Sequence, residues 1–483
     1  MTTDQKIRML LWKGLVAWML ATSFACARQA MEETARADSC FWIVRQLLFE
    51  GNKKTKEEIL LRELALLPGD TLPVAHWQEL LTRERNKLFN TDLFVTVEAW
   101  IAPDSATCGQ LVDIHYRFRE RWYVFPVFIF ELADRNFSEW LYDRGADLSR
   151  TNYGMRYVQK NLRGRNERLE LLFQQGFTRK YEFFYAFPYI DRNQRYGLEL
   201  RTQFMRNRDI PYISQDNKLL YWRSESVNRE RWNSEVRLRR REGFYLFHYL
   251  TLRYKREWVA DSVLVLNPNY FTDPNNNLQR YWELQYDLVK DRRDIAVYPL
   301  RGERWGLRLI KYGIGGFSDV DAFSIRGEGE RYWQLKGNWF ADLSGSFRFF
   351  WTQAQPYSLA RGLGYGEELP RGFQLYVMDG QHFFLLKTTL KYRFCDSSTY
   401  LRFMPLEEFR TFPLAFYGRL FFDHSYVSDK LLFYIDNRLA NRWLYAYGAG
   451  IDFVTFYNVV LQAEIARNNL GETGFFFNIR GTF

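Results

Sequence analysis

Long apolar runs are scarce in this 483-residue chain. Beyond an N-terminal segment, no apolar stretch reaches the length of about 18 residues that a membrane-spanning helix requires. The mature protein is therefore predicted to have no transmembrane helix. Two classes of exported protein remain: a soluble protein, or a protein that crosses a membrane with β-strands.

Cysteine and histidine are also rare, with 4 and 5 residues respectively. The histidines have no metal-ligand spacing, so the sequence predicts neither a metal site nor a cofactor. They are His76, His115, His248, His382 and His424. The motif G-x-S-x-G, which marks the nucleophile of many hydrolases, does not occur. No pattern in the sequence indicates bond-making chemistry, and we expect no enzymatic activity.

The first residues have the pattern of an export signal. Basic residues precede an apolar run at 14–25, which is too short to span a bilayer. The Ala-Cys-Ala sequence that ends at Ala27 fits a signal-peptidase site. We therefore predict a signal peptide at 1–27 and a short linker at 28–39. A lipidated Cys26 is an alternative that the sequence leaves open.

Basic and aromatic residues are abundant, and together they indicate a protein that contacts a membrane. The formal net charge of +10 predicts an anionic partner, either nucleic acid or an anionic membrane surface. Aromatic residues make up 18% of the chain, a density that is typical of the aromatic belts at membrane interfaces. We therefore expect lipid, and no nucleic acid, as a partner.

Apolar and polar residues alternate along many segments after residue 121. In the segment 281–288, Trp282, Leu284, Tyr286 and Leu288 alternate with Glu283, Gln285 and Asp287. Such a pattern is required where one face of a sheet meets lipid and the other a wet lumen. A soluble sandwich would instead bury its apolar face and turn every 8–12 residues or so. About 360 residues, at about 22 per strand and connection, predict a transmembrane β-barrel of about 16 antiparallel strands.

The region 40–121 has a different pattern, which predicts a small α/β domain with the order β-α-α-β-β. A threonine cap, early acidic residues and apolar residues at helical spacing indicate the first helix. Alternating residues indicate the strands. The predicted elements are a strand at 40–52, helices at 55–64 and 74–92, and strands at 93–101 and 110–118.

Four segments of the chain resemble the Omp85 superfamily of outer-membrane assembly and secretion proteins. They read FEGNKKTKEEILLREL, LPGDTL, NKLFNTDLFVTVEAW and RERWYVFPVFIFELADRNFSEW, and they follow the order of the family. The resemblance implies that residues 40–121 form a single POTRA domain in the periplasm of a Gram-negative bacterium. It also implies that residues 122–483 form a 16-stranded outer-membrane barrel, with a loop around 353–381 inserted into the lumen.

The tip of that loop carries a second match to the family. Arg371, Gly372 and Phe373 stand where the family has its (V/I)-R-G-(F/Y) motif. The resemblance implies that Arg371 pairs with an acidic residue in an F-x-D-x-G segment of a barrel strand. The sequence FFDHS offers Phe421 and Asp423 for this role. Gly372 is then the bend of the loop, and Phe373 its packing anchor.

Two residues depart from the family pattern around this predicted contact. Pro370 stands where an aliphatic residue precedes the arginine, and Ser425 stands where glycine is expected. Both departures bear on the local geometry of the contact rather than on the family. The sequence leaves open whether they alter the contact or are tolerated.

The resemblance also implies two sites for client polypeptides. The first barrel strand closes against the last, and this closure forms a lateral seam that can open into lipid. The seam is expected to involve Phe475, Phe477 and Phe483. In the POTRA domain, an exposed edge strand would take up an extended client segment by β-augmentation. The edge strand is expected to contain Leu93, Val95 and Val97.

The resemblance implies one disulfide. Cys40 opens the first POTRA strand, and Cys108 immediately precedes the last. Because the sheet of the family suggests that these two strands pair in parallel, their starts lie side by side. We therefore predict a Cys40–Cys108 disulfide, which leaves Cys395 as a spare thiol.

The family assigns the chain to polypeptide handling, with two functions open. An assembly factor inserts client polypeptides through the lateral seam, whereas a two-partner secretion transporter passes an extended client through the lumen. A single POTRA domain and a short linker favour the assembly factor, because those transporters commonly add a plug helix and a second POTRA domain. A passive pore ranks last, since it gives the POTRA-like domain no role. Expected partners are unfolded outer-membrane or secreted clients, outer-membrane lipid, and periplasmic or lipoprotein accessory subunits.

Overall fold

The computed structural model of the chain describes most residues after position 40. The described residues are 41–102, 111–132, 139–143, 145–316, 318–354, 356–366, 368–402, 404, 410–430, 437–455 and 459–480. The predicted signal peptide, the linker, Phe483 and the predicted Cys40–Cys108 disulfide lie outside these ranges. Within them, no helix is both long enough and apolar enough to span a bilayer.

The N-terminal domain contains a four-stranded sheet with the order β2-β1-β4-β3. Its elements are β1 (Phe41–Glu50), α2 (Glu57–Glu63), β2 (Thr71–Pro73), α3 (Trp77–Phe89), β3 (Phe94–Ala102) and β4 (Leu111–Glu120). Strand β1 pairs in parallel with β4. The order differs from the expected one by the additional strand β2, which pairs with residues 41–43. A strand of three residues is too short to show an alternating pattern, so the sequence did not reveal it.

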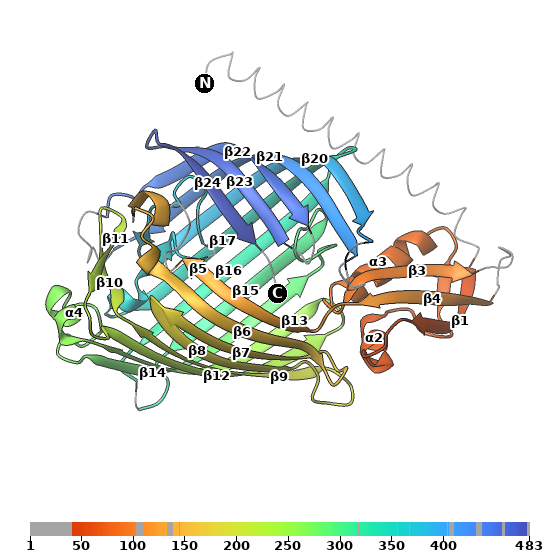
Figure 1. Cartoon of the computed structure of the whole chain (residues 1–483), viewed down its shortest axis with the longest axis horizontal. Coiled ribbons are helices and arrows are strands. Elements are labelled where there is room, and N and C mark those ends of the chain that lie inside the picture. The colour runs from red at the N-terminus through yellow and green to blue at the C-terminus, as the bar shows by residue number, and fades with distance from the viewer. Residues whose placement is uncertain are drawn as a thin grey trace, which may run out of the picture. The chain divides into compact units, whose positions relative to one another are not determined.

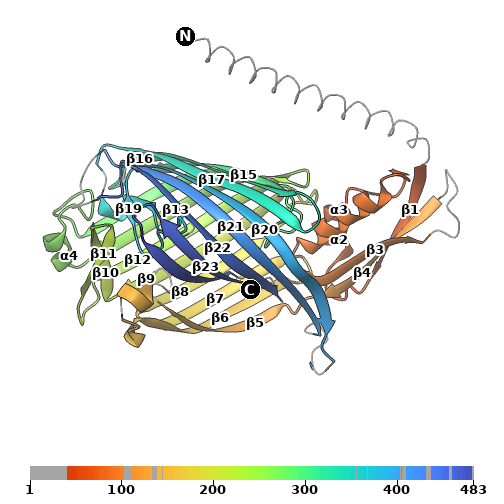
Figure 2. The same ribbon diagram turned by 90° about the horizontal axis from the view of Figure 1, so that it is seen from above.

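Alternation explains the core of this domain. Along β4 every second side chain is buried, namely Val112, Ile114, Tyr116 and Phe118. The helices add buried residues at helical spacing, namely Ile59 and Leu60 in α2 and Leu81 and Leu88 in α3. Both helices lie on one side of the sheet (Figure 2). One apolar face of the sheet is thereby covered, and the domain keeps β3 at its edge.

The large sheet has 16 strands, each paired antiparallel to its neighbours, and it curls into a barrel (Figure 1). Its order is β24-β23-β22-β21-β20-β17-β16-β15-β14-β13-β12-β9-β8-β7-β6-β5. The strands are β5 (Val124–Leu132), β6 (Thr151–Leu162), β7 (Glu167–Gly176), β8 (Thr178–Phe187), β9 (Tyr196–Asn207), β12 (Arg229–Glu242), β13 (Leu246–Val259), β14 (Leu278–Asp291), β15 (Gly302–Tyr312), β16 (Ala322–Gln334), β17 (Trp339–Thr352), β20 (His382–Tyr400), β21 (Thr411–Ser428), β22 (Trp443–Thr455), β23 (Val459–Asn468) and β24 (Thr473–Arg480). The predicted barrel and its number of strands are confirmed.

The predicted division of each strand into an apolar and a polar face is present. In β14, Glu283 is 1% exposed and its neighbour Leu284 is 39% exposed. In the last strand, Phe475 and Ile479 are exposed, whereas Phe476 is buried. Phe476 is an apolar exception on the inner face. Because the exposed side chains of the alternation are apolar and many of the buried ones are polar, the outer face suits lipid and the inner face a largely polar lumen.

Several shorter elements connect the barrel strands. They are the turns η1 (Glu139–Asp143), η2 (Leu148–Arg150) and η3 (Tyr357–Leu359), the helix α4 (Asp261–Leu266), and the strands β10 (Asp209–Gln215), β11 (Lys218–Arg223), β18 (Arg361–Leu363) and β19 (Met378–Asp379). The hairpin β10–β11 and the helix α4 lie at one end of the barrel, which we call the cap end (Figure 1). Buried residues of this end pack together, among them Ile210, Val263, Tyr270 and Tyr357.

Candidate functional site

The loop that connects β17 to β20 folds back onto the inner wall of the barrel. Within it, β18 and β19 form a small antiparallel pair. Loop residues Leu363, Phe373 and Met378 share one apolar cluster with wall residues of β20, β21 and β22. Those wall residues include Phe383, Leu385, Val427, Leu444 and Ala446. Phe373 is 1% exposed, and it thus occupies the anchoring position expected from the sequence.

Gly372 lies where the loop comes closest to the wall. Its φ is +80°, in the left-handed region that favours glycine. A Cβ atom at this position would lie 2.8 Å from the Cβ of Ala446, too close for two carbon atoms. The carbonyl of Gly372 accepts a hydrogen bond of 3.0 Å from Nδ2 of Asn468 in β23. The bend therefore requires glycine for both its backbone angle and its space.

Arg371 meets Asp423 of β21 inside the barrel. The Arg371 Nε atom lies 3.0 Å from each carboxylate oxygen of Asp423, and Nη2 also pairs with Oδ1. The backbone N–H of Arg371 donates a further hydrogen bond of 3.0 Å to Oδ2. Both residues are buried, at 9% and 1% exposed. A carboxylate that accepts several charge-assisted hydrogen bonds compensates the burial of the guanidinium.

The remaining donors of the Arg371 guanidinium are also hydrogen-bonded, and its face packs on an aromatic ring. Its Nη1 donates to Oγ1 of Thr389 at 3.1 Å, and its Nη2 donates to the carbonyl of Thr388 at 3.3 Å. The guanidinium carbon lies 4.2 Å from the ring centre of Phe421, a distance at which a cation–π interaction is favourable. The structure therefore brings together Arg371, Asp423 and Phe421, which were grouped from the sequence.

Two glycines of β22 make room for this arrangement, a feature that sequence reasoning missed. A Cβ atom at Gly448 would lie 2.6 Å from Cζ of Phe421, and one at Gly450 would lie 3.0 Å from Nε of Arg419. The available signal was the sequence YGAGIDF, in which two glycines recur at the period of a strand. Close approach of neighbouring side chains is the physical reason for them.

A second polar cluster, also missed from the sequence, fixes the loop next to the first. Gln374 donates from Nε2 to Oε1 of Glu464 in β23 at 2.7 Å. Glu464 also accepts a hydrogen bond of 2.7 Å from Nη2 of Arg419, and Nε of Arg419 lies 3.0 Å from Oδ1 of Asp452. The loop tip is thus held by buried charged groups of β21, β22 and β23.

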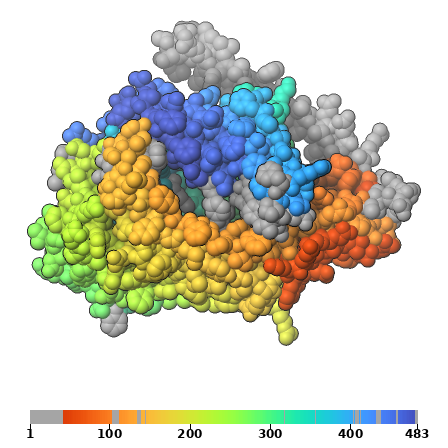
Figure 3. Space-filling model, viewed as in Figure 1, coloured from red at the N-terminus to blue at the C-terminus, as the bar shows by residue number. Residues whose placement is uncertain are grey.

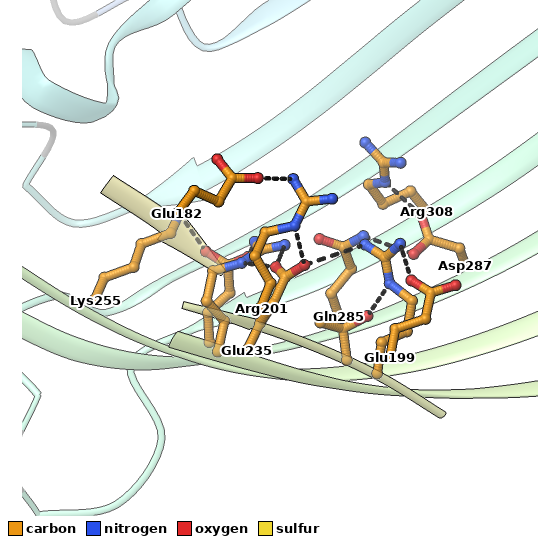
Figure 4. A network of polar contacts seen from close by, with 12 residues as sticks. Glu182, Glu199, Arg201, Glu235, Lys255, Gln285, Asp287 and Arg308 are labelled. Atoms are coloured by element: carbon orange, nitrogen blue, oxygen red, sulfur yellow. Dashed lines mark hydrogen bonds and ion pairs between the residues drawn. The ribbon is translucent and has the colours of Figure 1, made fainter. Parts of the chain in front are cut away.

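The inner wall between β8 and β15 carries another network of charges (Figure 4). Arg201 lies 3.4 Å from Glu182 and 3.7 Å from Glu235. Asp287 accepts hydrogen bonds from Arg308 and from Gln285. A cavity of about 330 Å³ lies against this wall. Its lining contains arginines as well as carboxylates, among them Arg308 and Asp287. Each of these carboxylates contacts a cation, so the wall is strongly polar and its negative charges are paired.

The proposed seam lies between the two ends of the large sheet. Strands β5 and β24 end the pairing order, and no hydrogen-bonded ladder joins them within the described residues. The surface is hollowed between the orange β5 and the dark-blue β24 (Figure 3). Phe475 and Phe477 lie exposed on β24, and Phe128 and Phe130 are exposed on β5. These aromatic side chains therefore flank the position where the barrel would close.

The proposed POTRA edge has a mixed arrangement. Strand β3 is at an edge of the N-terminal sheet, as expected, but Leu93 precedes the strand. Leu93 and Val97 are buried, at 1% and 7% exposed, and Val95 is half-buried. The apolar side chains of this segment therefore belong to the core of the domain, and only the backbone edge is available to a partner strand.

Comparisons with known proteins agree with this architecture. Residues 161–379 match the model of the Omp85 superfamily domain, and residues 43–121 match POTRA, described as a surface antigen variable number repeat. The structure is similar to BamA from Haemophilus ducreyi lacking POTRA domains 1–3, with 16% identity, coverage of 90% of this chain and 83% of that chain, and a TM-score of 0.50. It is also similar to CdiB from Escherichia coli, with 10% identity, coverage of 90% and 76%, and a TM-score of 0.54. A search of the curated proteins found no match. At these identities the structural similarity shows the shared fold.

Replacing either partner of the Arg371–Asp423 pair is expected to destabilise the barrel. Arg371→Ala and Asp423→Ala should each lower the free energy of unfolding by about 3–5 kcal/mol, because each leaves a buried charge without its partner. The double variant should lose less than the sum of the two. Urea unfolding of the detergent-solubilised chain, followed by tryptophan fluorescence, measures this.

The matched control is Arg438→Ala. Arg438 forms an ion pair of 2.9 Å with Asp216, but both side chains are more than half exposed. Exposed pairs of this kind contribute about 0–1 kcal/mol, so the control should unfold at nearly the same urea concentration as the natural protein. Additive losses in the double variant would show that Arg371 and Asp423 do not depend on each other.

Proposed function

The chain belongs to the Omp85 superfamily, and from this premise we propose that it is an outer-membrane assembly factor. In this proposal the POTRA domain receives client polypeptides in the periplasm, and the barrel inserts them into the membrane through its lateral seam. Membership of the family supports the coarser statement that the protein acts in outer-membrane insertion or in secretion of polypeptides. Outer-membrane lipid and accessory subunits complete the partners we expect. The work is non-covalent and needs no catalytic residue.

The observation that carries the proposal is that no hydrogen-bonded ladder joins β5 and β24 within the part of the chain that the structure describes. Within the described residues, all other neighbouring barrel strands form antiparallel ladders. Backbone N–H and C=O groups without partners in the hydrocarbon region cost several kcal/mol each, so such an edge is unfavourable in lipid unless another strand pairs with it. An extended client segment supplies the missing partner through its backbone, whatever its sequence.

The inserted loop supports insertion over passage through the lumen. Its tip is held by the Arg371–Asp423 pair and by the contact between Gln374 and Glu464. Moving a polypeptide along the lumen past this site requires these buried polar contacts to break, which costs more than a sideways exit through an unpaired seam. Secretion through the lumen remains the alternative function, and the same loop would then act as a plug.

Depletion of the protein in its host distinguishes the two functions. If the protein is an assembly factor, quantitative proteomics of the outer membrane should show that many β-barrel proteins decline together. A deficit confined to one secreted product, with the barrel proteins unchanged, would instead support the transporter. An outer membrane and a secretome that both stay unchanged would argue against both functions.

Locking the seam is expected to stop insertion. We suggest paired cysteines, one at Val127 or Ile129 in β5 and one at Gly474 or Asn478 in β24, in a Cys395→Ser background. Strands that must separate for a client cannot do so across a covalent bond, so oxidation should abolish complementation of the depletion strain and reduction should restore it. Single-cysteine variants are the control. Full activity of the oxidised pair would rule out lateral opening.

The free backbone edge of β3 can be tested with two adjacent prolines. Neighbouring residues of a strand direct their N–H groups to opposite sides, so one of Val95→Pro and Thr96→Pro disrupts the sheet and the other changes only the free edge. We expect the variant that keeps the stability of the natural protein to lose client binding. Photo-crosslinking from the exposed position 98 measures this binding. Undiminished crosslinking in that variant would exclude β3 as the docking strand.

A further inference from the structure

Three arginines gather on the inner side of the cap end, where they outnumber the neighbouring carboxylates of Glu257 and Asp379. Arg229 and Arg231 are two residues apart on β12, so both side chains lie on the inner face of the wall. Arg361 begins β18 in the inserted loop. Ala360, the residue before Arg361, packs in the same apolar cluster as Val259, and Val259 lies opposite Arg229 on β13. This packing brings the start of β18 close to the two arginines of β12.

The described residues give this cluster little compensation. The nearest carboxylate contact is that of Glu257, whose Oε1 atom lies 3.9 Å from Nη1 of Arg229. The polar contact found for the side chain of Arg231 is with the sulfur atom of Met205 at 3.6 Å. The guanidinium of Arg361 lies over the ring of Tyr365, 5.4 Å from its centre.

Unused donors point to a missing group. Arg229 is 7% exposed, donates to Oδ1 of Asn207 at 3.3 Å and also contacts the hydroxyl of Tyr270. The Nε atoms of Arg229 and Arg231 are both buried, and neither has a hydrogen-bond partner among the described residues. A buried donor of a charged group that stays unpaired is costly, which makes it rare without a partner such as a bound ion.

The same wall shows the opposite arrangement a short distance along the strands. Arg253 pairs with Glu235 at 2.6 Å and also contacts Glu283, and Lys255 pairs with Glu283 at 2.7 Å. These residues of β12, β13 and β14 are adjacent in register to the arginine cluster, since Arg231 lies opposite Glu257 on β13. On the same three strands, the middle of the wall is therefore paired, whereas Arg229 and Arg231 at the cap end share the single carboxylate of Glu257.

We propose that Arg229, Arg231 and Arg361 form a binding site for one oxyanion, a carboxylate or a phosphate. The planar guanidinium group presents parallel donors that match both chemistries. Such a group has two sources: a free phosphate ion, or an acidic side chain of a polypeptide inside the lumen. Because Arg361 belongs to the loop and the other two belong to β12, the bound anion would join the start of the loop to the wall.

Inorganic phosphate is the probe for this site. The purified full-length chain in detergent is titrated with sodium phosphate against sodium chloride of equal ionic strength, and binding is measured by calorimetry and by the thermal unfolding midpoint. We expect saturable binding with a higher midpoint in phosphate. Arg231→Gln should weaken this binding at least tenfold. Without phosphate, Arg231→Gln should be no less stable than the natural protein, because the change removes repulsion between like charges.

Two further variants keep the test decisive. Arg361→Gln removes the arginine that the loop contributes and should also weaken phosphate binding at least tenfold. This variant tests the site independently of Arg231→Gln, should that change in β12 impair folding. Arg304→Gln is the matched control, because it removes the same charge from the lumen at a residue already paired with Glu328 at 2.7 Å. It should leave phosphate binding unchanged. Equal losses in the control, or no phosphate effect beyond that of chloride, would overturn the site.

A pair of peptides identifies the source of the anion. The two peptides share one sequence and differ by glutamate or glutamine at a single central position. Displacement of phosphate by the glutamate peptide alone would support the site and identify a polypeptide carboxylate as its ligand. Displacement by neither peptide, with phosphate binding intact, would support the site and identify a free ion.

Discussion

The buried pair of Arg371 and Asp423 is the contact on which the interior of the barrel depends. A guanidinium and a carboxylate removed from water are stable together only when nearly all of their hydrogen-bonding capacity is used. Here the carboxylate accepts side-chain and backbone donors of one residue, while Thr388 and Thr389 accept the remaining guanidinium donors. The pair sets the depth to which the loop enters the lumen, and the apolar cluster around Phe373 forms at that depth.

The loop connects distant parts of the wall. Its tip contacts β21 and β23 through Asp423, Glu464 and Asn468. Its other end contacts the hairpin β10–β11 at the cap end, where Ser214 donates to Asp379 and Asn217 donates to the carbonyl of Val377 at 2.9 Å. A segment of about thirty residues thus lies inside the barrel and connects the wall at β21 and β23 to the hairpin β10–β11. The contacts of the loop tip lie on β21, β22 and β23, and within the described residues no ladder joins the end strands β5 and β24.

The sequence predicted those features that repeat or that depend on a few specific residues. Period-2 alternation was sufficient for the barrel, whereas the pairing of Arg371 with Asp423 was implied by the resemblance of their two segments to the family. The short strand β2 was missed because three residues carry no period. The inward direction of Leu93 and Val97 was missed because an edge strand of a half-covered sheet still packs one face. The cluster of Arg419, Asp452 and Glu464 was missed because its members come from three strands, and only the register places them together.

The two glycines of β22 have a consequence for how this interior can change. The space beside Gly448 is filled by Phe421, and the space beside Gly450 by Arg419. Arg371 of the loop tip in turn lies over the ring of Phe421, 4.2 Å from its centre. The loop tip therefore fits β22 by way of β21, although Arg371 and Gly448 are 77 positions apart in the chain. Exchange of the loop alone between related barrels would transfer the loop tip without the residues of β21 and β22 that fit it. A functional chimera therefore has to carry β21 and β22 along with the loop, because these segments fit one another.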